Sequence, residues 1–368
     1  MMRRFLTAAA ALAVATPAGA QLFDGMRLQT GPQFVQYRIA GPIDETISEL
    51  AIPIFAIVPI GSRFSVDVGT SYAQSRVRFA GGESTVSGLT DTQLRANYSL
   101  GNDFIVLTAG VNLPTGETTV ALDQLLAASR IANDFLSFPI SSMGAGTAVT
   151  GGMAIARPLG TWNVGAGGSV RLASAFDPVQ PESGPVPRYQ PGNEYKLRVG
   201  ADRPVGAGQF ALGLTFSTFG EDDFAGSLYN TGDRYVGQVG YARPVSFGTF
   251  TIGAWNLYRS AGQLIGGVDV PWDNIVNAST SLAINTRGPT IEPSVQVRSW
   301  FQRVGATSAD AARTDRSTLA ELGLRARVAA GPFAVFPGVG FAFGGLAAGA
   351  DDTARLTGFR GTLGVQIR

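Results

Sequence analysis

The feature that most constrains this chain is a long series of segments in which apolar and polar residues alternate. Between residues 161 and 173, for example, one face of an extended chain carries Trp162, Val164, Ala166, Val170 and Leu172. Successive side chains of a β-strand point to opposite faces, so alternation over such lengths indicates strands and not helices. The pattern predicts sixteen strands, at residues 33–40, 46–59, 62–77, 89–99, 103–113, 146–158, 161–174, 192–204, 208–219, 232–245, 249–260, 274–287, 290–304, 317–330, 333–346 and 354–368.

The connections between these strands alternate between short and long. The long ones are expected at residues 41–45, 78–88, 114–145, 175–191, 220–231, 261–273, 305–316 and 347–353. A transmembrane up-and-down barrel has this order, because antiparallel strands are joined by short periplasmic turns at one end and long extracellular loops at the other. The sequence therefore predicts an all-β fold: one antiparallel barrel domain over residues 21–368, with about 16 strands (range 12–18).

Aromatic residues recur near both ends of the predicted strands. Phe64 and Tyr72 share one strand, and Phe333 and Phe343 share another. At a rise of about 3.3 Å per residue and a tilt near 40°, such pairs span roughly 20–25 Å, the height of an outer-membrane apolar band with its aromatic girdles. The spacing favours a membrane barrel over a soluble β-sandwich.

Residues 1–20 read as a cleaved signal peptide and not as part of the fold. Two arginines are followed by an apolar run and then by Ala18-Gly19-Ala20, small residues typical of a cleavage site. The apolar run is about half of the ~20 residues that a transmembrane helix needs. We therefore expect export to the bacterial outer membrane, with periplasmic termini.

The chain contains no cysteine and no histidine. This composition excludes thiol catalysis, Ser-His catalysis and metal or haem sites built on those residues. The formal net charge of +1 does not suggest a nucleic-acid partner. We expect no enzymatic activity, no cofactor and no metal site.

Alternation places many charged residues on the inward face of the barrel. The basic residues expected there are Arg38, Arg95, Arg171, Lys196, Arg198, Arg234, Arg298, Arg325, Arg327 and Arg360, and the acidic ones are Glu49, Asp67, Asp91, Glu194, Asp202, Glu292 and Glu321. A charged interior indicates a water-filled channel with weak charge selectivity. The candidate constriction residues on the wall are Arg95, Arg198, Arg298, Arg325, Arg327 and Arg360, although for any single one an ion pair within the lumen is the simpler role.

The loop at 114–145 is the longest connection, and residues 120–136 within it have helical spacing. Leu122, Leu125 and Leu126 lie near one face, and a helix of about 17 residues is only marginally stable alone in water. Its apolar face must therefore pack, either on the inner wall or on neighbouring loops above the rim. Wall packing, with Phe104, Val106 and Phe336 as the shelf, would narrow the pore and place Asp123 and Arg130 beside the passage.

A short repeat closes three of the predicted strands at the short-turn end. Its copies are Arg157-Pro158-Leu159-Gly160, Arg203-Pro204-Val205-Gly206 and Arg243-Pro244-Val245-Ser246. Each arginine has outward parity, so it could reach lipid phosphate while proline ends the strand pairing. A recurrent turn sequence without a lipid role explains the repeat equally well.

Residues 87–116 resemble a known family. Gly88, Asp91, Leu94 and Tyr98, followed by Leu113-Pro114-Thr115-Gly116, are similar to a motif of the outer-membrane barrel proteins labelled meta-pathway phenol-degradation transporters. The resemblance covers about 30 residues and implies passage of small, often aromatic or hydrophobic compounds. It implies no catalytic residues.

The sequence thus favours an outer-membrane channel for the passive transport of small molecules, including hydrophobic or aromatic compounds. A general diffusion porin for hydrophilic solutes and a non-conducting structural or adhesive barrel remain alternatives. The expected partners are outer-membrane lipid, small solutes and, during biogenesis, the barrel assembly machinery. The sequence does not specify the solute, gating or the oligomeric state.

Overall fold

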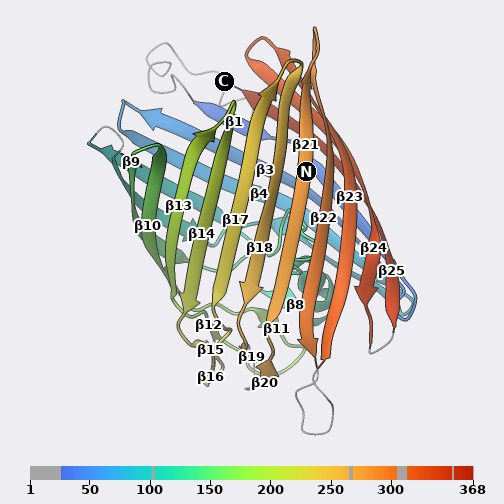
Figure 1. The fold of residues 1–368 in the computed structure, drawn as a ribbon. Helices are drawn as coiled ribbons and strands as arrows, with labels where there is room; N and C mark the ends of the chain where they lie inside the picture. The colour runs from blue at the N-terminus through green and yellow to red at the C-terminus, as the bar shows by residue number, and fades with distance from the viewer. Residues whose placement is uncertain (1–25, 102–103, 265–267, 305–312, 350–351, 368) are drawn as a thin grey trace.

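The computed structural model describes residues 26–101, 104–264, 268–304, 313–349 and 352–367. The expected signal peptide lies outside the described residues. Within them, the chain forms a closed antiparallel barrel (Figure 1). The sheet contains 18 named strands, but two pairs, β1 with β2 and β5 with β6, are each one barrel strand with an interruption. The barrel therefore has the sixteen strands that the alternation predicts.

The sixteen predicted ranges match strands to within a few residues, whereas β1 and β5 were not predicted. The first half of the barrel contains β1 (Arg27–Thr30), β2 (Gln33–Ala40), β3 (Glu45–Ile60), β4 (Phe64–Phe79), β5 (Gly82–Leu89), β6 (Thr92–Leu100), β7 (Ile105–Leu113), β9 (Ala148–Leu159) and β10 (Trp162–Ala173). The second half contains β13 (Glu194–Val205), β14 (Gly208–Phe219), β17 (Arg234–Val245), β18 (Gly248–Arg259), β21 (Asp273–Asn285), β22 (Thr290–Val304), β23 (Arg313–Ala330), β24 (Phe333–Ala347) and β25 (Thr353–Ile367).

The barrel closes where its first and last strands meet. β25 pairs with β24 on one side and with β1 and β2 on the other, and β1 and β2 in turn pair with β3. The interruption between β1 and β2 falls at Gly31-Pro32, where proline has no N–H to contribute to the ladder. Closure leaves no free sheet edge along this seam, as a membrane environment requires.

The connection expected at 78–88 is wrong, because these residues form a hairpin. β4 continues to Phe79, turns at Ala80-Gly81, and pairs with β5 from Gly82. Gly81 and Gly82 permit the tight turn, whereas the surrounding run of small and polar residues had suggested a loop.

The interruption between β5 and β6 is a β-bulge at Thr90-Asp91. Tyr72 of β4 pairs with Leu89, but Gly69 of β4 pairs with Gln93, so the β5–β6 strand has one extra residue. Such an insertion reverses the order in which side chains point in and out. In this barrel it directs Asp91 inward, where it is buried.

The outer surface carries the apolar belt of a transmembrane barrel. Large apolar side chains exposed at mid-height include Met153, Val164, Leu197, Val199, Leu212, Leu214, Val239, Ile252, Leu322 and Val339. Outward aromatic rings stand beside one another on neighbouring strands, with 4.9 Å between the ring centroids of Phe216 and Tyr235 and 6.0 Å between those of Tyr235 and Tyr258. This combination is characteristic of membrane-spanning barrels.

The two ends of the barrel differ in the length of their connections. We call the end with the short turns the turn end, and the end with the long connections the loop end. The long connections contain further elements that the alternation did not predict: β8 (Val120–Ala121), the 3-10 helix η1 (Leu122–Gln124), α3 (Leu125–Ile131), β11 (Val179–Gln180), β12 (Tyr189–Gln190), β15 (Asp222–Phe224), β16 (Ser227–Tyr229), β19 (Gly262–Leu264) and β20 (Val268–Val270). In the part of the chain that the structure describes, no helix is long and apolar enough to cross a membrane.

Candidate functional site: the lumen and its inner loop

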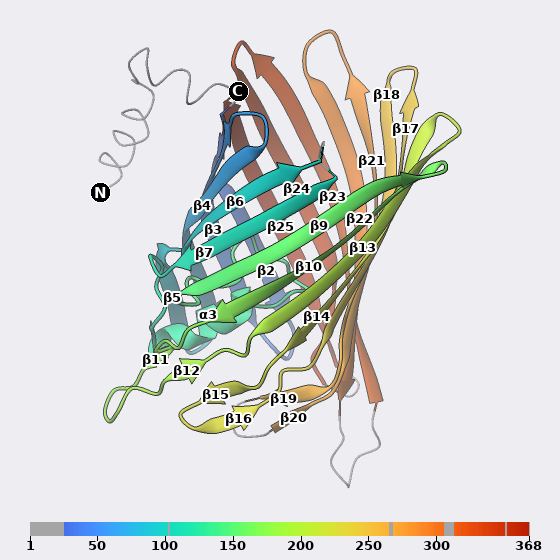
Figure 2. The same cartoon turned by 90° about the vertical axis from the view of Figure 1, so that its left-hand side faces the viewer.

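The connection between β7 and β9, residues 114–147, folds into the barrel, and we call it the inner loop. It contains β8, η1 and α3, followed by an irregular segment that returns to β9. Its residues Ala127, Ile131, Phe135 and Leu136 are buried in one cluster with side chains of the barrel wall. Figure 2 shows α3 beside β5 at the loop end. The inner loop therefore occupies part of the lumen at that end.

Side chains from three separate strands hold the centre of the inner loop through its backbone carbonyls. The donors and their carbonyl acceptors are Arg298 of β22 with Phe135, Tyr37 of β2 with Leu136 (3.0 Å), and Arg360 of β25 with Ser137 (3.2 Å). Ser137 itself has a φ of 55°, a conformation that residues other than glycine adopt rarely. The contacts from several strands hold this strained turn in place.

Charged side chains fasten the inner loop at two further places. Arg130 at the end of α3 pairs with Glu45 of β3 at 2.9 Å, and Asp134 pairs with Arg259 of β18 at 2.6 Å. Both pairs join the inner loop to the barrel wall, one to β3 and the other to β18. Arg130 therefore holds the inner loop instead of standing free beside the passage.

Glu49 adds a buried contact on β3. Its carboxylate accepts the backbone N–H of Ile140 at 2.8 Å and the hydroxyl of Ser75 at 3.0 Å. The side chain is fully buried, and a buried carboxylate is stable only with such partners.

The part of the wall that β2 forms beneath the inner loop is apolar, which corrects the assignment of Arg38. The inward residues of β2 are Val35, Tyr37 and Ile39, all buried, and Arg38 is exposed on the outer face. Phe138 of the inner loop contacts Tyr37 edge-on at 5.5 Å between ring centroids. The rule that polar residues face the lumen fails here, because protein and not water fills this part of the lumen.

The apolar shelf also differs from the expected one. The buried cluster contains Ile47, Val77, Ile275, Leu319 and Leu356 of the wall, and not Phe104, Val106 or Phe336. Phe135, which belongs to this cluster, stacks on Trp300 of β22 at 5.6 Å between ring centroids, and Trp300 packs against the same cluster.

The three leucines of the helical segment have different environments. Leu126 packs against the buried cluster and Leu125 is half-buried, whereas 47% of Leu122 is exposed. Asp123 is exposed, and its carbonyl accepts the hydroxyl of Ser84 of β5 at 2.5 Å. Most of the buried face of the segment is formed by Ala127 and Ile131.

Asp91 joins both ends of the inner loop. Its carboxylate accepts the N–H of Gly116 at 3.1 Å, the N–H of Ala145 at 2.7 Å and the amide of Asn112 at 2.8 Å. A side chain at Gly116 would collide with the carbonyl of Met143 and the nitrogen of Asp91. The residues that resemble a family motif therefore form the root of the inner loop, which explains why an aspartate and a glycine are needed there.

Replacing Asp91 with alanine is expected to loosen the inner loop while the barrel stays closed. Hydrogen bonds to a charged group contribute about 1.5–3 kcal/mol each, and the variant leaves the Gly116 and Ala145 N–H groups without this acceptor. Arg130 is the only basic residue in segment 114–147, so trypsin cleavage after it reports on the inner loop. We expect faster cleavage in Asp91→Ala than in wild type or in Glu182→Ala, an exposed-loop control; equal rates would show that Asp91 does not hold the root.

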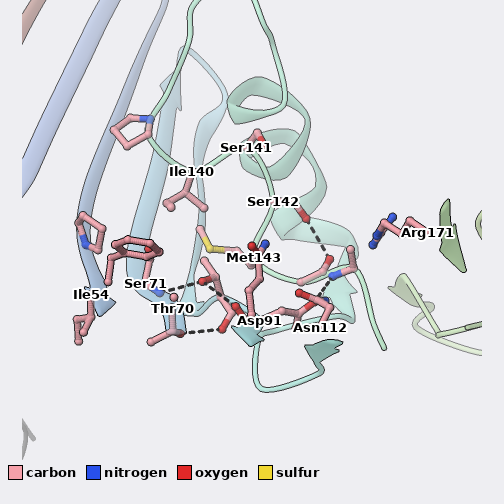
Figure 3. A pocket seen from close by; sticks show the side chains of 18 residues that line it. Ile54, Thr70, Ser71, Asp91, Asn112, Ile140, Ser141, Ser142, Met143 and Arg171 are labelled. Atoms are coloured by element: carbon pink, nitrogen blue, oxygen red, sulfur yellow. Dashed lines mark hydrogen bonds between the residues drawn. The ribbon is translucent and has the colours of Figure 1, made fainter. Parts of the chain in front are cut away.

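The wall opposite the inner loop is basic and lies on β10, β13 and β17. Arg171, Arg198 and Arg234 face the lumen there. Among the described residues, Arg171 and Arg198 form no ion pair, whereas Lys196 pairs with Glu194 at 3.0 Å. Figure 3 shows Arg171 reaching from its strand toward the inner loop, across from Ser142.

A cavity of 420 Å³ lies between the inner loop and the wall formed by β3, β4, β6 and β7, and Arg171 borders it from β10. Phe55, Ile140 and Met143 supply apolar surface, and Gln93 and Arg171 supply polar surface. Arg171 is therefore the residue of the basic wall that reaches this cavity.

The other predicted arginines are engaged within the barrel. Arg95 pairs with Asp67 at 2.6 Å, and Arg325 pairs with Glu292 at 2.5 Å. The guanidinium of Arg327 lies 5.8 Å from the centre of the Phe336 ring. Cavities of 380 and 550 Å³ adjoin Arg325 toward the turn end.

The small sheet of β12, β15 and β16 lies in the connections of the loop end. Tyr189 packs between Phe176 and Phe224. Burial, with the charge of Asp222 as a smaller cause, raises the pKa of Tyr189 well above its ordinary value, so its hydroxyl stays protonated at physiological pH.

Sequence reasoning missed most wall residues that hold the inner loop. Tyr37, Glu45, Arg259 and Trp300 were not singled out, and no local pattern marks them. Asp91 was noted only as an inward acid and as part of a motif, although its proximity to an L-P-T-G turn was a usable signal. In the described part of the chain, no cluster of acidic residues could hold a metal ion.

The fold and its lumen define a transmembrane β-barrel with a loop folded into the pore. No protein-family model matches the chain, and no curated protein matches it. Solved structures of outer-membrane barrels resemble the chain at 8–13% identity.

Three of these structures illustrate the similarity. An outer membrane channel from Pseudomonas putida F1 is 13% identical, with a TM-score of 0.39, covering 93% of this chain and 94% of that one. OpdK of Pseudomonas aeruginosa, solved with vanillate, is 8% identical, with a TM-score of 0.48, covering 94% and 99%. OprD of Pseudomonas aeruginosa is 10% identical, with a TM-score of 0.45, covering 94% and 97%.

Proposed function

We propose that this chain is a bacterial outer-membrane channel through which small molecules diffuse passively. Solutes would pass between the inner loop and the basic wall of β10, β13 and β17. The export segment expected at residues 1–20 agrees with that location. The inner loop narrows the lumen in this proposal, and the arginines of the opposite wall select among the solutes that fit.

The observation that carries the proposal is the pair of arginines opposite the inner loop that have no ion-pair partner among the described residues. Arg171 and Arg198 face the open lumen, whereas the other basic candidates are occupied by acids, carbonyls or aromatic rings. An arginine attracts anions and donates several hydrogen bonds. Such arginines need water or an anionic solute beside them, so this wall borders a water-filled lumen in the proposal and not a packed core.

The cavity beside Arg171 suggests the solute class. It combines the apolar surface of Phe55, Ile140 and Met143 with one cation. A small aromatic or apolar body with an anionic group fits both features, since the ring can leave water while the charge meets the guanidinium. The motif resemblance of residues 87–116 points to the same class of compounds.

Planar-bilayer recordings test this function. Purified protein is expected to conduct, and benzoate is expected to reduce the current more than benzyl alcohol, which has a similar ring without the charge. Arg171→Gln should weaken the effect of benzoate, and Arg95→Gln, which removes an arginine already paired with Asp67, should change it less. Folded protein without conductance would support a structural barrel instead.

A general diffusion porin is the second candidate. It is favoured by the small inward residues of the wall opposite the inner loop, which include Gly152, Ala154, Ala156, Gly165, Gly167 and Gly200, because they leave the lumen wide. Equal effects of benzoate and benzyl alcohol, unchanged in Arg171→Gln, would favour this function.

A further inference from the structure

The arginine-proline repeat forms a regular row on the outside of the barrel. Arg157, Arg203 and Arg243 lie on β9, β13 and β17, each two residues before the last paired residue of its strand at the turn end. One strand separates each from the next, and neighbouring strands lie 4.7–4.9 Å apart, so the arginines recur about every 10 Å at one height. All three have outward parity, since Glu194, Lys196 and Arg198 of β13, for instance, face the lumen at alternate positions.

In the part of the chain that the structure describes, the guanidinium groups of this row donate no hydrogen bond. None of the three arginines forms an ion pair among the described residues. The Nε of Arg203 is buried without a hydrogen-bond partner. Their neighbours on the adjoining strands are Val164, Phe210 and Phe250, all apolar.

Aromatic rings orient two of the guanidinium groups. That of Arg203 lies 4.7 Å from the centre of the Trp162 ring, and that of Arg157 lies 5.2 Å from the centre of the Phe104 ring. A guanidinium held by a ring keeps its N–H groups at the edge for an acceptor outside the protein. The expectation that the proline after each arginine ends the strand pairing is wrong, because each strand pairs for one residue beyond its proline; the proline only removes one backbone N–H beside the arginine.

The position of the row fits a lipid headgroup. It lies beside the outward rings at the turn end, where the apolar belt meets the polar region of the membrane. Exposed apolar side chains such as Leu159 and Phe247 flank it. In residues 151–165, 199–214 and 239–253 the only acid is Asp202, which faces the lumen opposite Asn163. A phosphate in this region would therefore meet cations without a competing carboxylate.

We propose that Arg157, Arg203 and Arg243 form a binding strip for the phosphate groups of anionic phospholipids at the turn end of the barrel. Each guanidinium donates two parallel hydrogen bonds to a headgroup phosphate, while the acyl chains lie along the apolar belt. Repetition of the same site on alternate strands holds a row of lipids against one side of the barrel.

Native mass spectrometry of the detergent-solubilised full barrel, mixed with phosphatidylglycerol, tests the strip. The variant carries Arg157→Gln, Arg203→Gln and Arg243→Gln. The matched control carries Arg38→Gln, Arg316→Gln and Arg355→Gln, three exposed arginines at the loop end. We expect the strip variant to retain severalfold fewer phosphatidylglycerol molecules than wild type, while the control retains as many as wild type. Phosphatidylcholine, whose phosphate is neutralised by its own choline cation, should be lost to a smaller extent.

Equal retention in the strip variant and wild type would overturn the proposal, as would the same loss in the control. Heat-dependent migration on a denaturing gel confirms that each barrel is folded. If the triple variant does not fold, Arg203→Gln and Arg203→Lys are compared instead. Loss with glutamine and partial retention with lysine support the strip, because lysine keeps the charge without the paired donors; retention of the lipid by both would contradict it.

Discussion

Replacing residues 118–143 with a short Gly-Ser linker is expected to raise the single-channel conductance severalfold and to admit larger solutes. The segment fills the lumen at the loop end, where its residues Phe135 and Leu136 are buried against the wall. Removing it also takes away the carbonyls to which Arg298 and Arg360 donate, while Arg360 keeps its ion pair with Glu321 at 3.7 Å. The pore would then be wider and more basic, so conductance and anion preference should increase together.

The matched control for this change is a Gly-Ser replacement of residues 181–186 in the connection between β11 and β12. These residues form no barrel strand, and conductance should remain that of wild type. Unchanged conductance in a folded inner-loop variant would mean that solutes do not pass beside the inner loop. The general porin would then be the better description.

Reversing the charge of Arg171 and Arg198 to glutamate is expected to change the channel from anion-preferring to cation-preferring. Both face the open lumen and have no ion-pair partner in the described ranges, so reversal alters the potential of the passage directly. The reversal potential under a salt gradient measures the effect. The difference in reversal potential between the variant and wild type should become smaller at high ionic strength, because salt screens exposed charges.

Arg325→Glu with Arg327→Glu is the comparison for this variant. It should shift selectivity toward cations by a smaller amount, since Arg325 already pairs with Glu292 and Arg327 lies on the ring of Phe336. A larger shift from this second variant would place the selective region at the turn end and contradict the proposed passage.

The barrel itself could be predicted from the sequence because its signal is local. Alternation such as that of Trp162 to Leu172 specifies each strand, and the strand partners follow from chain order in an up-and-down barrel. The same rule placed Arg198, Arg325 and Arg360 correctly on the inner face. The hairpin around Gly81-Gly82 was not predicted, because small and polar residues occur both in turns and in short strands.

The inner loop could not be predicted to the same depth, because its contacts join distant parts of the chain. Nothing near Phe135 in the sequence indicates that Arg298 binds its carbonyl or that Trp300 stacks on its ring. Arg38 was placed inward for the related reason that polarity identifies the lumen only where water fills it. Tyr37 and Ile39 face inward because the inner loop covers them, and the sequence around them does not indicate that cover.

Modification of Ser142→Cys in an open channel tests the central account most directly. The chain has no cysteine, so this variant has a single reactive thiol, on the exposed side of the inner loop that faces Arg171. Adding a bulky methanethiosulfonate reagent during a bilayer recording should lower the current in discrete steps, whereas Ser183→Cys, in the outer connection, should give no change. A modified Ser142→Cys channel that conducts as before would contradict a passage between the inner loop and the basic wall.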